Sequence, residues 1–209
     1  PGNCGRCVGT DRFSHGLGAS DINGDGRTDL LVTAGWWEAP AEANRAPWTF
    51  HPVDFGPDCA QMVVYDFDGD GDADVVTSSA HQFGIWWHEQ TDKGFERHLI
   101  DKSFSQTHAL CLADINGDHL PDLVTGKRWW AHGGHDPGSD QPAVVKWFEL
   151  TREAGRPKWI AHTIDEESGI GTQFEVTDVN GDGLLDVVTS NKKGVFYFEQ
   201  VRAADGESK

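Results

Sequence analysis

Four short segments of the chain place oxygen-bearing side chains at alternate positions around a glycine-rich turn. Counted from its first Asp, each segment has Asp or Asn at positions 1, 3, 5 and 9, and three of the four have Gly at position 6. The segments are residues 21–29, 66–74, 114–122 and 178–186. Alternation around a tight turn points positions 1, 3 and 5 inward, and Gly permits the positive φ that closes such a loop. Clustered oxygens of this kind are ligands for a hard cation.

Calcium is the cation that this donor set suits, because Ca²⁺ takes roughly six to eight oxygen ligands in flexible geometry. We expect side-chain ligands at positions 1, 3, 5 and 9 and a backbone carbonyl ligand at position 7. The predicted ligands are Asp21, Asn23, Asp25, Arg27 and Asp29; Asp66, Asp68, Asp70, Asp72 and Asp74; Asp114, Asn116, Asp118, Leu120 and Asp122; and Asp178, Asn180, Asp182, Leu184 and Asp186. Without the ion the carboxylates would repel one another, so binding energy becomes folding energy. The alternative is an Asp-Gly turn cluster without metal, which four copies in register disfavour.

The third loop departs from the other three. His119 replaces the Gly of position 6, and Pro121 stiffens position 8. We therefore expect three to four Ca²⁺ ions per chain, with the third loop as the weakest site.

The segments around the loops repeat as well, and they predict β-strands. A short apolar run precedes each loop, a β-branched run follows it, and an aromatic run such as 85–89 comes next. A fourth run, for example 95–101, follows in three of the four units. The loops begin 45, 48 and 64 residues apart, and the long interval holds the Gly- and Pro-rich stretch 133–142, an expected loop insertion. Four short strands per unit of about 45 residues are typical of a β-propeller blade.

The predicted fold is therefore all-β: a propeller of four-stranded blades, either a four-bladed ring or part of a larger propeller. The expected boundaries are an N-terminal segment at 1–12, a propeller at 13–200 and a tail at 201–209; the blades are 13–54, 55–101, 102–165 and 166–200. The last unit lacks a fourth strand, which residues 4–11 are placed to supply. An incomplete ring would expose strand edges and favour oligomerisation.

Composition restricts the partners and the compartment. The 209 residues carry a formal net charge of −17, which disfavours nucleic acid and anionic membranes as partners. No apolar stretch approaches the roughly 20 residues that span a bilayer, so membrane insertion is not expected. Cys4 and Cys7 form a lone C-x-x-C, for which a local disulfide or free thiols are both favoured over a metal site. Calcium loops are most useful where calcium is abundant, which favours an extracellular or periplasmic location.

The end of the propeller opposite the Asp loops, which we call the channel face, gathers a second set of chemistry-bearing residues. Units one and three begin their inner strands with His15 and His108, and units two and four with Gln61 and Gln173. The connections between second and third strands add the basic and imidazole groups of His81, Lys127, Arg128, His132 and Lys192. Two tryptophans, Trp36 and Trp130, could stack on sugars. This set predicts a site for an anionic or polyhydroxylated ligand. His15 and His108 could also ligate a transition metal.

Structural roles compete with these interpretations. Inner-strand His and Gln often hydrogen-bond to neighbouring backbone, and the paired tryptophans are core residues first. His51, His98 and His162 recur at one position of the outer strand, so we expect them to pack or hydrogen-bond between strands.

On these loops and strands the chain resembles the FG-GAP/VCBS repeat family, the calcium-binding blades also found in integrin α-chain propellers. The resemblance covers nearly all of 13–200 and implies a propeller with its ions on one face. A narrower similarity is to the propeller of aldos-2-ulose dehydratases and related bacterial proteins. It is carried by segments 107–118 and 125–132. Neither resemblance fixes an activity, because such blades serve adhesion, lectin and enzyme proteins alike.

Two functions follow as hypotheses. The first is a calcium-stabilised binding module that recognises carbohydrate or a protein partner at the channel face. The second is a metal-assisted sugar lyase or dehydratase at the mouth of the central channel, with His15, His108 and His132 as the candidate catalytic residues. The chain shows no Ser-His-Asp spacing, phosphate loop or zinc motif, which favours binding.

Overall fold

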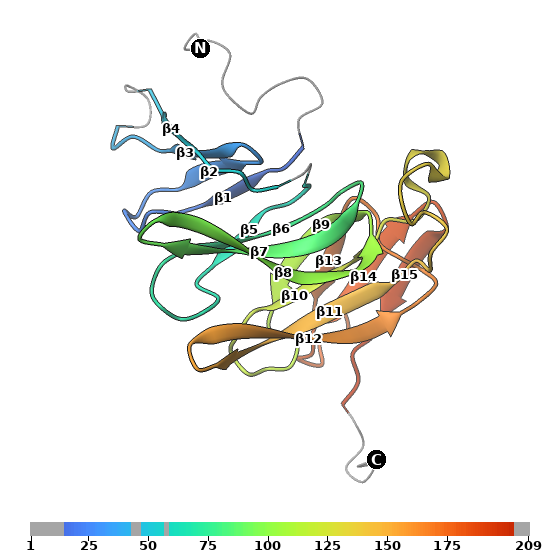
Figure 1. Ribbon diagram of the computed structural model, residues 1–209. Helices are drawn as coiled ribbons and strands as arrows, with labels where there is room; N and C mark the ends of the chain where they lie inside the picture. The colour runs from blue at the N-terminus through green and yellow to red at the C-terminus, as the bar shows by residue number, and fades with distance from the viewer. Residues whose placement is uncertain (1–14, 43–46, 57–58, 203–209) are drawn as a thin grey trace.

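A computed structural model describes residues 15–42, 47–56 and 59–202. Over this part of the chain, fifteen strands form four antiparallel sheets. Figure 1 shows them arranged as successive blades of a β-propeller. No helix in the described residues is long and apolar enough to cross a membrane. The proposed closing strand at 4–11 and the pair Cys4 and Cys7 lie outside the described residues.

Each blade is a meander of consecutive strands. The first blade contains β1 (Gly18–Ser20), β2 (Asp29–Val32), β3 (Gly35–Glu38) and β4 (Thr49–Pro52). The second contains β5 (Val63–Tyr65), β6 (Asp74–Ser78), β7 (Phe83–Thr91) and β8 (Gly94–Ser105), so β8 runs past the expected blade end at residue 101. The third contains β9 (Thr107–Ala113), β10 (Asp122–Lys127), β11 (Val145–Glu153) and β12 (Arg156–Asp165). The fourth contains β13 (Phe174–Thr177), β14 (Asp186–Asn191) and β15 (Gly194–Phe198).

The inner strands of neighbouring blades lie against one another: β1 against β5, β5 against β9 and β9 against β13. Leu17 and Gln61 form a parallel bridge between the first two blades, and Arg128 and Ile170 form one between the last two. The Asp loops join each first strand to its second, so all four lie at one end of the propeller. The connection from β10 to β11, with the short 3₁₀ helix η1 (Ala131–Gly134), lies at the channel face.

The core sits between the blades. One cluster joins Phe67, Val76 and Trp87 of the second blade to Leu123 and Phe148 of the third. Similar clusters join the first blade to the second and the third to the fourth. β-Branched and aromatic residues dominate because each strand packs a pleated face against the adjacent sheet.

Candidate functional site

The four Asp loops fold in the same way around their first aspartate. Its Oδ1 accepts the N–H of position 4, and its Oδ2 accepts the N–H of position 6. In the first loop, Asp21 accepts from Gly24 at 2.9 Å and from Gly26 at 2.7 Å. The same two bonds are made by Asp66, Asp114 and Asp178. The sequence repeat is therefore a structural repeat in atomic detail.

Positions 3 and 5 are also turned back into the loop. In the fourth loop, Asn180 Oδ1 accepts Asp182 N–H at 3.0 Å, and Asp182 Oδ1 accepts Leu184 N–H at 2.8 Å. Equivalent bonds form in the other three loops. Oxygen atoms from positions 1, 3 and 5 thus gather within each turn. The position-7 carbonyl ligands, at Arg27, Asp72, Leu120 and Leu184, stay predictions.

The position-9 aspartates have a structural role that the pattern alone does not reveal. Asp29, Asp74, Asp122 and Asp186 are at most 1% exposed. In each, Oδ2 accepts the N–H of loop position 2, and Oδ1 accepts an N–H from the second half of the third strand or from just beyond that strand. Each carboxylate therefore ties its loop to its own blade. Ca²⁺ coordination by these residues would come in addition to that tie.

The third loop keeps this geometry despite His119. This residue adopts φ 73°, in the left-handed region where the other loops have Gly, and its N–H still bonds Asp114 Oδ2 at 3.0 Å. A non-glycine residue in that region costs about 1 kcal/mol. The substitution expected to compromise the loop is therefore absorbed as local strain, and the donor set of the third loop is intact.

The donor chemistry fits a hard divalent cation. In the second loop, one oxygen from each of Asp66, Asp68 and Asp74 lies within 4.8 Å of the others. Burial raises the pKa of Asp74 to about 6, and burial also raises the pKa of Asp68. Carboxylates gathered in this way are held at an electrostatic cost that a bound cation would relieve.

Three of the four loops are also tied to the next blade. Gln90 of β7 donates from Nε2 to Ile22 O at 3.4 Å, and Gln200, just after β15, donates to Ile115 O at 2.9 Å. Arg152 of β11 donates to Phe67 O at 2.9 Å and to Asp66 O. In every case a side chain from the third strand, or just after it, reaches the loop of the preceding blade. Order in a loop is therefore coupled to blade packing.

The recurrent outer-strand histidines are structural, as predicted. Nε2 of His51, His98 and His162 lies 2.7, 2.7 and 2.8 Å from Glu38, Glu89 and Glu149, respectively. Each ring stacks on a tryptophan of the adjacent strand: Trp36, Trp87 and Trp147.

At the channel face, the residues that open the inner strands line one cavity. Its volume is about 390 Å³, and its lining comes from all four units: His15, Gly16, Leu17, Ala60, Gln61, His108, Thr172 and Gln173. The rings of His15 and His108 meet edge to face with centroids 5.6 Å apart. The structure therefore brings together the four inner-strand positions that the sequence singled out. We call this cavity the channel pocket.

Histidines extend from the channel pocket toward the third blade. The His15 ring lies 4.9 Å from His81, and His81 lies 4.6 Å from His132. Burial lowers the pKa of His108 to about 4, with Arg128, His15 and His81 adding to the effect, so its imidazole is neutral at pH 7. A neutral imidazole can accept a hydrogen bond or ligate a metal.

Two predicted ligand-binding residues are corrected by their surroundings, and a third has one of its atoms engaged. Trp36 is 9% exposed, packs in the core and stacks on His51, so it offers no open face to a sugar. Lys127 is fully buried, and its amine donates to Gly138 O beneath the β10–β11 connection. Gln61 is exposed and lines the channel pocket, but its Oε1 accepts Leu110 N–H at 2.8 Å, which joins the second and third blades and leaves its NH₂ group as the part that can reach a ligand.

Other predicted residues remain available. Gln173 is exposed and Arg128 is half-buried. Trp130 is 47% exposed and has φ 54°. Lys192, from the β14–β15 hairpin, donates to Trp130 O at 2.9 Å, which fixes the hairpin against this aromatic surface.

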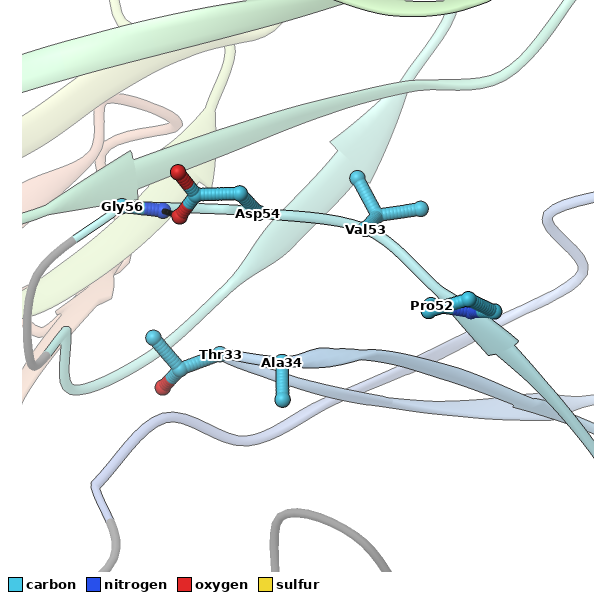
Figure 2. A pocket seen from close by; sticks show the side chains of 6 residues that line it. All are labelled: Thr33, Ala34, Pro52, Val53, Asp54 and Gly56. Carbon is cyan, nitrogen blue, oxygen red and sulfur yellow. Dashed lines mark hydrogen bonds between the residues drawn. The ribbon is translucent and has the colours of Figure 1, made fainter.

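A second hollow lies beside the first blade, between the β2–β3 connection and the segment after β4. Figure 2 shows its lining of Thr33, Ala34, Pro52, Val53, Asp54 and Gly56. Its volume is about 490 Å³, but its one carboxylate, Asp54, already accepts Gly56 N–H at 2.9 Å. Because the polar groups do not converge, we place the candidate site in the channel pocket.

Two residues near the line of histidines were not predicted from the sequence: Gln106 and Asp136. Gln106 Nε2 donates to Asp136 Oδ2 at 3.1 Å, and His132 Nδ1 lies 2.9 Å from the same oxygen. Burial alone would raise the pKa of Asp136, but the hydrogen bonds from Gln106 and His132 outweigh it and lower that pKa. Asp136 lies in the insertion, which has no counterpart in the other units, so the repeat gave no signal for it.

Comparisons with known proteins agree with the repeats. A family model described as an FG-GAP-like repeat matches residues 66–125, and an FG-GAP repeat model matches residues 13–43. No curated protein matches the chain. Among solved structures, a chain from a study of specific recognition of non-reducing terminal N-acetylglucosamine by an Agrocybe aegerita lectin aligns with TM-score 0.54 and 18% identity. The alignment covers 88% of this chain and 49% of that one, so this chain spans about half the length of the lectin chain. At this identity the likeness concerns the fold.

Proposed function

We propose, from the FG-GAP repeat matches over residues 13–43 and 66–125 and from the geometry of the site, that the chain is a calcium-stabilised β-propeller module that binds a carbohydrate at its channel face. The observation that carries the proposal is the channel pocket. One cavity of about 390 Å³ gathers imidazole, amide and hydroxyl groups from all four units, at the end opposite the Asp loops. A concave site with a few convergent polar groups is the usual form of a small-ligand site.

Calcium is proposed for the loops on the basis of their donor sets. Every loop turns the side-chain oxygens of positions 1, 3 and 5 inward, and none offers the sulfur ligands that softer metals favour. The ion would neutralise carboxylates that the fold holds together, and it would stiffen loops tied to the neighbouring blade. Such sites suit the calcium concentrations outside the cytosol, so we place the protein in an extracellular or periplasmic compartment.

A carbohydrate suits the channel face better than a large apolar ligand. Sugar hydroxyls can hydrogen-bond to His108, Gln173 and the side chain of Thr172. The exposed ring of Trp130 lies at the same end of the propeller and offers a stacking surface. The lectin with the similar fold is consistent with this choice, although at 18% identity it indicates no particular sugar. A protein partner at the same face is the other occupant that the test must distinguish.

The test combines a glycan array with calorimetry. The calcium-loaded chain should bind a restricted set of glycans, and His108→Ala and Trp130→Ala should each weaken that binding at least about tenfold. Lys158→Ala is the matched control, because its exposed ion pair with Glu153 lies near the calcium end. If the glycan arrays stay empty and the chain captures a protein partner that His108→Ala no longer binds, the ligand of the channel face is a protein and not a carbohydrate. Thermal melting unaffected by EGTA would count against structural calcium.

A metal-assisted sugar lyase or dehydratase is the second candidate, and the line of four histidine rings is the observation that favours it. A neutral His108 could serve as a general base, while a metal would supply Lewis acidity. Incubation with keto-sugars, followed by NMR, tests this function. Turnover that His15→Ala and His108→Ala abolish would establish it, and the absence of any consumed sugar would leave the binding function in place.

A further inference from the structure

The connection between β10 and β11 carries a second cluster of donor atoms. His81 Nδ1 lies 3.5 Å from Asp136 Oδ2, and His132 Nδ1 lies 2.9 Å from the same oxygen. The three donor atoms all lie within 4.8 Å of one another. Around a tetrahedral zinc ion with bonds of about 2.0–2.1 Å, ligand atoms are about 3.3 Å apart. The donor atoms of the cluster are therefore already close to the spacing of a metal site, and a small movement of the histidine rings would complete it.

The cluster is built from two blades. His81 stands on the short β6–β7 connection of the second blade, and His132 and Asp136 come from the insertion of the third. Around His132 the backbone is strained, because Trp130 and His132 have φ 54° and 46° and the next two residues are left-handed glycines. Left-handed non-glycine residues cost about 1–3 kcal/mol each and persist where the surroundings impose them, often at functional sites.

Gln106 supplies an independent indication that something else binds here. It is fully buried with φ 59°, and its Nε2 donates to Asp136 Oδ2. Its Oε1 is buried and has no hydrogen-bond partner among the described residues. The neighbouring hydroxyls of Ser105 and Thr107 are in the same condition. A buried unpaired polar atom costs about 1–3 kcal/mol, so Gln106 Oε1, on a side chain bonded to Asp136, suits a site that contains water or a hydrated ion.

We propose that His81, His132 and Asp136 bind a divalent transition-metal ion of the zinc class, with Gln106 orienting the Asp136 carboxylate. Two imidazoles and one carboxylate are borderline donors that suit Zn²⁺ or Co²⁺, whereas Ca²⁺ requires an all-oxygen set. Three protein ligands leave a coordination position for water or for an oxygen atom of a ligand. This site is separate from the calcium loops and does not depend on the carbohydrate proposal. It is an alternative to His15 and His108, the pair that the sequence suggested for a transition metal.

The test is a Co²⁺ and Zn²⁺ titration of the full chain, stripped with EDTA and then saturated with Ca²⁺ to fill the Asp loops. The wild type should bind one Co²⁺ per chain, seen in its visible absorption, and one Zn²⁺ by calorimetry. His132→Ala and Asp136→Asn should each weaken binding more than about 100-fold. Gln106→Ala should weaken it about 10- to 100-fold, as expected of an outer-shell partner. His135→Ala is the matched control, because this exposed histidine caps the same 3₁₀ helix outside the cluster.

Several outcomes would overturn the site. Binding that persists unchanged in both His132→Ala and Asp136→Asn would remove it. Loss of binding that follows His15→Ala and His108→Ala but spares His132→Ala would move the metal to the channel pocket. A wild type that binds neither ion at micromolar concentration would leave an ordinary hydrogen-bonded His–Asp cluster. Because the His132 side chain is 48% exposed, its variant should fold, and circular dichroism with an unchanged calcium-dependent melting temperature checks this.

Discussion

Replacement of Asp122 by Ala tests whether the position-9 aspartates are structural ties as well as calcium ligands. The Asp122 carboxylate is fully buried and accepts N–H groups from Ile115 at 2.9 Å and Leu150 at 3.0 Å. Truncation to Ala leaves both donors buried without an acceptor. Each orphaned donor costs about 1–3 kcal/mol, so we expect a loss of about 2–6 kcal/mol in the free energy of unfolding. That is a large share of the roughly 5–15 kcal/mol typical of a folded protein.

Denaturant unfolding in excess Ca²⁺ and in EGTA separates the two roles of the residue. Asp118→Ala is the matched control in the same loop. The Asp118 carboxylate is exposed and accepts Leu120 N–H at 2.8 Å, a bond that water can replace. Asp118→Ala should therefore be destabilising in Ca²⁺ and nearly neutral in EGTA. Asp122→Ala should lose at least about 2 kcal/mol in both conditions.

A calcium series covers the case in which EGTA unfolds the wild type. The free energy of unfolding rises with the logarithm of free calcium, with a slope set by the number of ions bound on folding. Asp118→Ala should reduce the slope, whereas Asp122→Ala should lower the stability at every calcium concentration. If Asp122→Ala changes stability by less than about 1 kcal/mol once calcium is absent, the residue acts as a metal ligand alone and the argument from buried N–H groups is wrong.

Four further substitutions, in three predictions, test the local interactions. His119→Gly should raise the free energy of unfolding in Ca²⁺ by up to about 1 kcal/mol, because it relieves the strain of φ 73°. Gly26→Ala, at φ 84° in open space, should lower the free energy of unfolding by about 1 kcal/mol. Changes of the same sign and size in the two variants would refute the strain argument. Arg152→Ala should lower the free energy of unfolding by about 1–2 kcal/mol, since its guanidinium donates to the carbonyl of Phe67. Calorimetry should also show weaker calcium binding at the second loop. Unchanged calcium affinity would mean that this interblade hydrogen bond has no effect on the ion site. Burial lowers the pKa of His88 to about 4, below the roughly 6.5 of an unfolded histidine, so the unfolded chain takes up its proton first and stability falls as pH drops through 6.5 toward 4. By pH 5 the loss attributable to this group is about 2 kcal/mol, and urea unfolding of His88→Gln should show a shallower decline between pH 6.5 and 5 than the wild type; parallel declines would contradict the shift.

The fold was accessible from the sequence because its information is local and repeated. Asp-rich turns, β-branched strands and aromatic strands follow in the same order in each unit, so the propeller class and the Asp loops could be read without long-range contacts. The inner-strand histidines His15 and His108 were placed correctly at one cavity, because strand position alone fixes which end of a blade they occupy.

The misjudged residues are those whose surroundings come from elsewhere in the chain. Lys127 looked available for a ligand, but the insertion places Gly138 O over its amine. Trp36 looked like a sugar platform, but the adjacent strand stacks His51 on it. Asp136 had no counterpart in the repeat from which to be recognised. Predicting these three environments requires the path of the insertion and the register of the outer strand, which no local pattern encodes.

The two ends of the propeller differ in how they hold their polar groups. At the end that carries the Asp loops, the buried carboxylates accept backbone N–H groups, and Gln90, Arg152 and Gln200 reach across to the loop of the preceding blade. At the channel face, Gln106, Trp130 and His132 occupy left-handed backbone, and Gln106 leaves a buried oxygen unpaired. Backbone strain and unpaired buried polar atoms lower the stability of the fold. The geometry of the channel face is therefore maintained by the hydrogen bonds at the end that carries the Asp loops. Loosening the Asp loops should therefore weaken the proposed metal and ligand binding at the channel face, although no Asp loop contributes a residue to either proposed site.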